Sequence, residues 1–150
     1  MSVRSDDTPA RRLISSGSSF EALAGYSRAV VDGRDVHVSG TTGFDYATMA
    51  IADDVVVQTR QCLANIAAAL AQAGCTLDDV VRVRYLLTDA ADFARVAPLF
   101  GEAFARARPA ATALVVGLVD ARMKIEIEVD ARIPAPCAPP PHAWGPVTGA

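Results

Sequence analysis

Hydrophobic and polar residues alternate along much of the chain, which is the pattern of β-strands with one buried face. The alternation is longest over residues 124–133, where every second residue is apolar. Nearer the N-terminus, two short apolar runs flank Asp32-Gly33, a pair that is typical of the two-residue turn of a hairpin. The sequence therefore predicts strands over residues 11–15, 27–31, 34–39, 80–87, 111–116 and 124–133.

Two other segments repeat apolar residues every three or four positions, as amphipathic helices do. The longer one covers residues 55–73; two aspartates before it favour a helix start, and Gly74 favours a helix end. The other covers residues 92–106, and Pro98 predicts that its regular part starts near Val96. We expect the buried stripes to consist of Cys62, Leu63, Ile66, Leu70 and Ala73 in the first helix and Phe93, Val96, Phe100 and Phe104 in the second.

This order of elements, βββαβαββ, predicts an α+β fold with a single mixed sheet that carries both helices on one face. The strand at 80–87 is expected to face the helices with Val81, Val83, Tyr85 and Leu87. The opposite face of the sheet is charged and carries Arg82, Arg84, Lys124, Glu126, Glu128, Asp130 and Arg132. A face of this kind either meets water or lines an interface or cleft in an oligomer, and the pattern leaves both interpretations open. Residues 40–51 predict an irregular segment.

The chain has 150 residues, which fits one domain. We expect this domain to cover residues 11–133, after a flexible N-terminus at residues 1–10. Six of the nine prolines follow residue 133, in a stretch without any charged side chain. Because consecutive prolines extend neither a helix nor a sheet, residues 134–150 predict a disordered tail.

Charge and composition argue against several classes of function. The formal net charge is −3 and no basic stripe occurs, which argues against a nucleic-acid partner. No run of about 18 uncharged apolar residues occurs, so no membrane span is predicted. The first residues carry charges of both signs and predict a cytoplasmic protein without a secretory signal. The three cysteines, Cys62, Cys75 and Cys137, form no CxxC pair, so neither a disulfide framework nor a metal site is expected.

Five motifs together resemble the YjgF/RidA family of reactive-intermediate deaminases, which is also labelled endoribonuclease L-PSP. They are GYSRAV (25–30), HVSGTTG (37–43), DFARV (92–96), RPAAT (108–112) and MKIEIEVDA (123–131). The resemblance covers about residues 11–133. It implies a chorismate-mutase-like fold and a homotrimer in which three sheets pack into a central barrel, with ligand clefts at the subunit boundaries. Active members of the family hydrolyse reactive enamines and imines to a keto acid and ammonia, and they use no metal or organic cofactor.

The resemblance also assigns roles to individual residues. Glu126 falls on the glutamate that orients or activates the attacking water, and Tyr26 falls on the cleft tyrosine. Ser39 and Gly40 fall on the small residues whose backbone approaches the ligand. Active members carry an arginine in a P-A-R-[ST] motif that holds the substrate carboxylate through a bidentate contact. This chain has Ala111 at that position and resembles divergent branches that lack the carboxylate clamp.

Another arginine could replace the missing clamp. Arg84 is the first candidate, because alternation places it on the same sheet face as Glu126 and Glu128. The alternative is that Arg84 only forms a cross-strand ion pair with one of these carboxylates. Arg82 is a further candidate, and Arg28, beside the cleft tyrosine, is a weaker one.

Three other side chains have two interpretations each. His37 alternates onto the face of Ser39, so it either reaches the cleft or forms a structural hydrogen bond. Phe44 and Tyr46, in the segment predicted to be irregular, either form an apolar wall of the pocket or belong to the core.

Two functions follow from these observations. The first is hydrolysis of a reactive enamine, imine or related small carbonyl metabolite in the clefts of a homotrimer, with water positioned by Glu126. The alternative is a non-catalytic trimeric module that binds a small ligand or protects proteins, which the departures from the family pattern at Ala97, Ala111 and Ala113 favour. Ribonuclease activity follows only from the family's other label, and the acidic charge counts against it.

Overall fold

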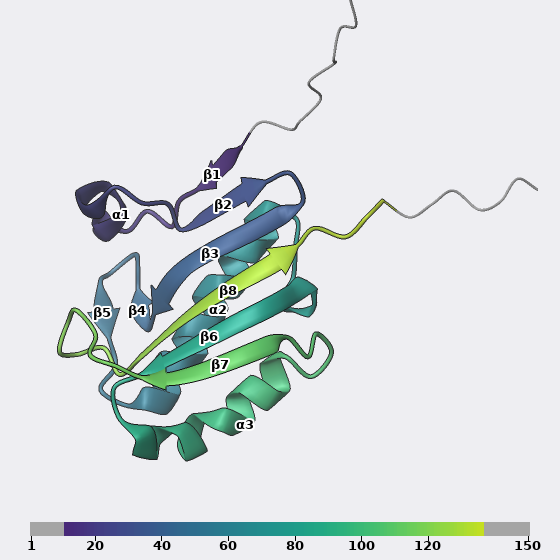
Figure 1. The fold of residues 1–150 in the computed structure, drawn as a ribbon. Coiled ribbons are helices and arrows are strands. Elements are labelled where there is room, and N and C mark those ends of the chain that lie inside the picture. The colour runs from purple at the N-terminus through teal and green to yellow at the C-terminus, as the bar shows by residue number, and fades with distance from the viewer. Residues whose placement is uncertain (1–10, 137–150) are drawn as a thin grey trace, which may run out of the picture.

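The structure is a computed structural model that describes residues 11–136, and its centre is a six-stranded mixed sheet (Figure 1). The strands are β1 (Arg12–Ile14), β2 (Ala29–Asp32), β3 (Asp35–Thr42), β6 (Val80–Leu87), β7 (Ala110–Val115) and β8 (Ile125–Arg132). They lie in the order β1-β2-β3-β8-β6-β7. β6 and β7 run parallel, and the other neighbours in this sheet run antiparallel.

Two long helices cover one face of this sheet. The remaining elements are α1 (Ser19–Ala24), α2 (Val55–Ala73), α3 (Phe93–Ala103), two 3-10 turns (Leu77–Asp79 and Ala90–Asp92), and a small hairpin of β4 (Phe44–Asp45) and β5 (Ala50–Ile51). α2 lies behind the sheet in Figure 1, and α3 lies beside it next to β7. Both helices contribute to one core together with the apolar sides of the strands. The predicted α+β fold is therefore confirmed, whereas α1 and the β4–β5 hairpin are too short to leave a periodic pattern.

The ends of α2 match the prediction because local signals define both of them. The carboxylate of Asp54 accepts hydrogen bonds from the N–H groups of Val56 at 2.9 Å and Val57 at 3.2 Å, which caps the first turn. Gly74 ends the helix with a φ of 83°, a left-handed conformation that favours glycine. The predicted stripe of this helix is buried as expected: Cys62, Leu63, Ile66, Leu70 and Ala73.

Two details of the predicted strands are wrong. The hairpin turn consists of Gly33 and the residue after it, because Asp32 still pairs with Asp35 in the ladder. Gly33 has the positive φ of 62° that the first position of such a turn requires. In β6, the register with β8 shifts at Val81, which is a β-bulge. Val81 is therefore 54% exposed, and Val80 is buried in its place.

The start of the second helix also differs from the prediction. A 3-10 turn capped by Asp89 leads directly into α3, which begins at Phe93 and keeps Pro98 in its interior. Pro98 removes the hydrogen bond to the Ala94 carbonyl, and both residues are exposed, so water can satisfy that carbonyl. Phe93 is 43% exposed instead of buried. Phe100 of α3 packs on the sheet, where its ring stacks on that of Tyr85 of β6 with centroids 3.8 Å apart.

Within residues 11–136, no helix is both long and apolar enough to cross a bilayer. The predicted flexible segment 1–10 and most of the predicted disordered tail, residues 137–150, lie outside the described residues. Cys137 belongs to this tail.

Candidate functional site

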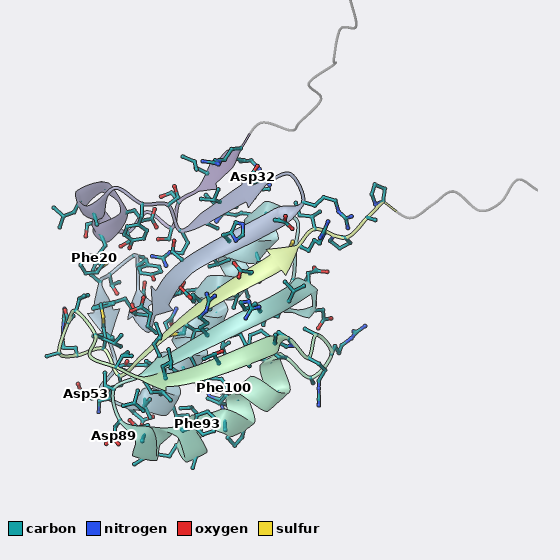
Figure 2. The ribbon with its side chains drawn as sticks, viewed as in Figure 1. Phe20, Asp32, Asp53, Asp89, Phe93 and Phe100 are labelled. Carbon is teal, nitrogen blue, oxygen red and sulfur yellow. The ribbon has the colours of Figure 1, made fainter. Side chains whose placement is uncertain are left out.

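Three of the predicted site residues line one small cavity. Tyr26, from the segment before β2, Gly40 of β3 and Glu126 of β8 surround a space of about 180 Å³. α1, the β4–β5 hairpin and the loop between β7 and β8 contribute Phe20, Tyr46, Val119 and Met123 to the other walls. Arg28, directly before β2, and Thr42 of β3 complete them. Figure 2 shows Phe20 between α1 and the small hairpin. We call this space the Glu126 cavity.

An irregularity in the sheet creates room for Glu126. In the β3–β8 ladder, Val38 pairs with Val129 but Thr41 pairs with Ile127, so β3 contains one extra residue there. This is a β-bulge, and Gly40 lies within it. A Cβ atom at Gly40 would lie 2.8 Å from Cδ of Glu126 and would overlap its Oε1. The carboxylate of Glu126 therefore lies directly against a backbone position that only glycine leaves open.

The surroundings of Glu126 shift the pKa of its carboxyl group upward. Burial raises the pKa of Glu126, the nearby charge of Glu128 raises it further, and Arg28 opposes both effects. Glu126 has no hydrogen-bonding or ion-pair partner among residues 11–136. A half-buried carboxylate with a raised pKa and no partner is suited to accept and return a proton.

The cation nearest to this carboxylate is Arg28, which sequence reasoning ranked below Arg84. Arg28 is 2% exposed. Its Nη1 donates to the carbonyl of Gly40 at 2.8 Å and to Oγ1 of Thr41 at 2.9 Å, and its Nη2 donates to the hydroxyl of Tyr26 at 3.2 Å. Arg28 therefore fixes the backbone at Gly40 and the ring of Tyr26 at once. The GYSRAV motif placed this arginine near the site, but alternation along a strand gave no sign that it is buried.

Glu21 of α1 compensates the charge of Arg28. The Nε atom of Arg28 lies 3.6 Å from Oε1 of Glu21, and Glu21 is 7% exposed. Ser15 donates its hydroxyl to Glu21 at 2.6 Å, and Ser16 donates both its backbone N–H, at 3.0 Å, and its hydroxyl. Burial acts to raise the pKa of Glu21, but these hydrogen bonds and the charge of Arg28 outweigh it, so the pKa is lowered. Glu21 stays ionised and pairs with Arg28.

Aromatic rings complete the surroundings of Arg28. Its guanidinium lies 4.9 Å from the ring centre of Tyr46 and 5.5 Å from that of Tyr26, within the range of cation–π contacts. Burial raises the pKa of Tyr46, and Arg28 acts against this effect. Phe44 belongs to the core, where it is fully buried and meets Phe20 edge to face at 5.9 Å. Of the two aromatic residues with open interpretations, Tyr46 lines the cavity and Phe44 does not.

Arg84 and Ser39 lie in a different hollow of about 220 Å³ on the open face of the sheet. Nη1 of Arg84 lies 2.5 Å from Oε1 of Glu128, which is the cross-strand ion pair of the alternative interpretation. His37 forms the next pair, with its Nδ1 2.7 Å from Oδ1 of Asp130. Ser39 donates its hydroxyl to a backbone carbonyl at 2.6 Å. Within one copy of the chain, Arg84 and Ser39 do not line the Glu126 cavity.

Ala111 is also distant from this cavity within one copy. Ala111 pairs with Val83 of β6, whereas Glu126 pairs with Leu86 on the other side of that strand. The two positions are thus three residues apart along the strands and two strands apart across the sheet, about 14 Å by ideal spacings. Every residue of β7 is exposed. The family's clamp position therefore lies on an open edge of the sheet.

No group of three or more histidine, cysteine or acidic side chains is placed to hold a metal ion in the part of the chain that the structure describes. Cys62 is fully buried in α2, and burial raises the pKa of its thiol, so it remains protonated.

Known proteins resemble this chain over its whole described domain. Residues 16–133 match the family model described as endoribonuclease L-PSP. A 2-iminobutanoate/2-iminopropanoate deaminase from Capra hircus is 34% identical over 119 residues, which are 79% of this chain and 87% of that protein. Protein DfrA from Myxococcus xanthus is 38% identical over 122 residues, covering 79% of this chain and 93% of that protein. A crystal structure of a Mycobacterium tuberculosis member of the YjgF/YER057c/UK114 family has 43% identity and a TM-score of 0.75, covering 82% of this chain and 99% of the other.

Proposed function

Because this chain belongs to the YjgF/RidA family, we propose that it hydrolyses a small reactive imine, enamine or related carbonyl metabolite in the Glu126 cavity. The observation that carries the proposal is the half-buried carboxylate of Glu126, which has a raised pKa and no partner among residues 11–136. The cavity of about 180 Å³ is smaller than a drug-sized pocket and fits a small metabolite.

The proposed reaction needs one group that moves protons. Water adds to the imine carbon and forms the C–O bond, while Glu126 accepts the proton that the water loses. Glu126 then returns this proton to the nitrogen of the tetrahedral carbinolamine. The hydroxyl proton then passes to nitrogen by the same carboxylate as the C–N bond breaks with its electron pair on nitrogen, and the products are a carbonyl compound and ammonia. Arg28 is a positioning residue in this scheme, because it holds Tyr26 and the backbone at Gly40 around the reacting atoms.

The proposed assembly is a homotrimer whose clefts lie at the subunit boundaries. β7 is an edge strand with all its residues exposed, and it includes Leu114 at 46% and Val115 at 58% exposure. Exposed apolar edge strands favour pairing with another chain. A second copy that presented β7 to the Glu126 cavity would bring Ala111 to it, as the family pattern implies. The proposed compartment is the cytoplasm.

Hydrolysis of imines made in situ tests the proposal. An amine oxidase and an amino-acid oxidase supply carboxylate-free imines and imino acids, and 2-aminoacrylate supplies an enamine. We expect the protein to accelerate release of ammonia from at least one of these classes over buffer, and Glu126→Gln to remove that acceleration. Rates equal to buffer with all three classes, or full activity of Glu126→Gln, would contradict the proposal.

The second candidate is a non-catalytic trimeric module that binds a small ligand or protects other proteins. The alanine at the clamp position supports it, because alanine offers no donor to a substrate carboxylate. This candidate predicts a Glu126→Ala variant that keeps the ligand affinity and cellular role of the original protein.

A further inference from the structure

Of the two charged side chains that line the Glu126 cavity, only Arg28 has an ion-pair partner within the described residues. Arg28 is matched by Glu21, whose Oε1 lies 3.6 Å from its Nε. Both hydrogen bonds of Nη1 go to Gly40 and Thr41, and Nη2 donates to Tyr26. Glu126 has no such match among residues 11–136. Arg28 also lines the cavity, but Glu21 matches its charge, so the carboxylate of Glu126 is the charge that a ligand meets without an ion-pair partner among the described residues.

Arg84 and Arg122 do not change this balance, since each is held by a carboxylate. Arg84 pairs with Glu128 at 2.5 Å in the other hollow. Arg122 pairs with Asp120 through two contacts of 3.0 and 2.8 Å. The six residues of β7, AATALV, include no charged side chain. The strand itself would therefore bring no cation from a second copy, and the nearest arginine on this edge is Arg108, two residues before β7.

The walls of the cavity add to this preference. The rings of Phe20, Tyr26 and Tyr46 and the side chains of Ala24, Val119 and Met123 form its apolar walls. Apolar walls exclude water, so a charge beside Glu126 is attracted more strongly than it would be in solvent.

We propose that the Glu126 cavity selects small imines without a carboxylate in their protonated, iminium form, and that it discriminates against imino acids. This inference rests on the proposed function and names its substrate class. A protonated imine is both the partner that the carboxylate lacks and the more electrophilic form of the substrate. The iminium ion and a water molecule become a carbonyl compound and an ammonium ion, and both protons of the water pass to nitrogen in turn through Glu126. A cyclic iminium ion would open in the same way to an amino-carbonyl compound.

Binding of unreactive ring amines tests charge selection apart from turnover. Pyrrolidine is protonated at neutral pH and lacks a carboxylate, whereas proline has the same ring with a carboxylate. We expect titration calorimetry to show pyrrolidinium binding at least about tenfold more tightly than proline, since an unpaired buried carboxylate distinguishes them by ~1.4 kcal/mol or more. Glu126→Gln should remove this preference. Glu102→Gln is the control: it removes an exposed carboxylate of α3 that lies outside the cavity, and it should leave the preference unchanged.

The outcomes separate this inference from the proposed function. Equal or tighter binding of proline by the original protein, or no binding of pyrrolidinium, overturns the inference, even if imines are hydrolysed. Loss of the preference in Glu102→Gln also overturns it. Glu126-dependent binding of pyrrolidinium without hydrolysis of any imine supports charge selection and contradicts the proposed catalysis. Faster hydrolysis of 1-pyrroline than of its carboxylate-bearing analogue supports both, and Ala111→Arg should then shift the ratio toward the carboxylate-bearing ring.

Discussion

Replacement of Gly40 by alanine should disable Glu126 while leaving the fold almost unchanged. The new Cβ atom would lie 2.8 Å from Cδ and 3.2 Å from Cγ of Glu126. Carbon atoms in contact normally stay about 3.5–4.0 Å apart, so the carboxyl carbon must retreat by at least about 0.7 Å. The atoms that move belong to the end of a flexible side chain, and no positive φ at Gly40 hinders alanine. The strain therefore falls on the position of the carboxylate.

The expected change in stability is small, whereas the expected change in rate is large. An altered rotamer of Glu126 costs about 0.5–1.5 kcal/mol, and loss of glycine from the unfolded chain returns about 0.4–1 kcal/mol, so stability should change by less than about 1 kcal/mol. A misplacement of about 1 Å at a reacting group can cost about a hundredfold in rate. We expect Gly40→Ala to lower the rate of imine hydrolysis by roughly 10- to 100-fold.

Two other glycines provide matched controls. A Cβ atom at Gly43 would lie 2.7 Å from Cα of Gln58, which is backbone of α2 and cannot move easily. Gly43→Ala should therefore destabilise the fold by about 1–3 kcal/mol. A Cβ atom at Gly101 meets nothing within 4 Å, and alanine in the middle of a helix should stabilise α3 by roughly 0.5–1 kcal/mol. Urea unfolding and hydrolysis rates of the three variants separate damage to the site from damage to the fold.

A double variant identifies Glu126 as the group through which Gly40→Ala acts. In a Glu126→Gln background, Gly40→Ala should cause little additional loss of rate, because residues that act as one unit are not additive. A full additional loss in that background would refute the reasoning, and so would a Gly40→Ala protein that keeps more than about half of the original rate.

Other variants test the charges around the cavity and the open edge. Arg28→Met should cost about 3–5 kcal/mol in urea unfolding because it leaves Glu21 buried without its cation; adding Glu21→Gln should recover part of this loss, and no recovery would count against the pair. Glu126→Gln should raise the melting temperature at neutral pH, because the folded protein raises the pKa of this carboxyl and so is penalised above that pKa. The gain should shrink as the pH falls through the folded pKa, and a gain independent of pH would contradict it. Leu114→Glu on β7 should dissociate the proposed trimer in light scattering, whereas Leu23→Glu, at an 86% exposed position of α1, should not.

Features set by neighbouring residues were predictable from the sequence. Both ends of α2 follow from an aspartate cap and a glycine, and these act within a few residues of the helix. The alternation in β8 also held, because a strand in the middle of a sheet shows one face to the core and the other to solvent or a cleft. The bulge at Val81 was not predictable, since it depends on the register between β6 and β8 rather than on either strand alone.

The candidate site was predictable only in part, because it depends on contacts between segments that are distant in the sequence. Motifs identified Tyr26, Gly40 and Glu126, and these three meet around one cavity. Arg28 was undervalued because arginines are seldom fully buried, and its burial depends on Glu21, which lies in a helix that the sequence did not predict. Arg84 lies on the predicted sheet face and pairs with Glu128 in the other hollow of one copy, so its role in a cleft between copies stays a prediction.

The bulge in β3 explains why the site forms at this end of the sheet. Without the extra residue between Val38 and Thr41, the ladder with β8 would continue in register. Every β3 side chain after that point would then lie on the opposite face of the sheet from the one it has now. With the extra residue, Thr42 lies opposite Glu126, and Gly40 presents bare backbone to the carboxylate. The same backbone turns its carbonyl to Arg28. The extra residue in β3 and the absence of a side chain at Gly40 thus create the space that the unpaired carboxylate of Glu126 occupies. In a regular strand with a larger residue at this position, a side chain would fill that space.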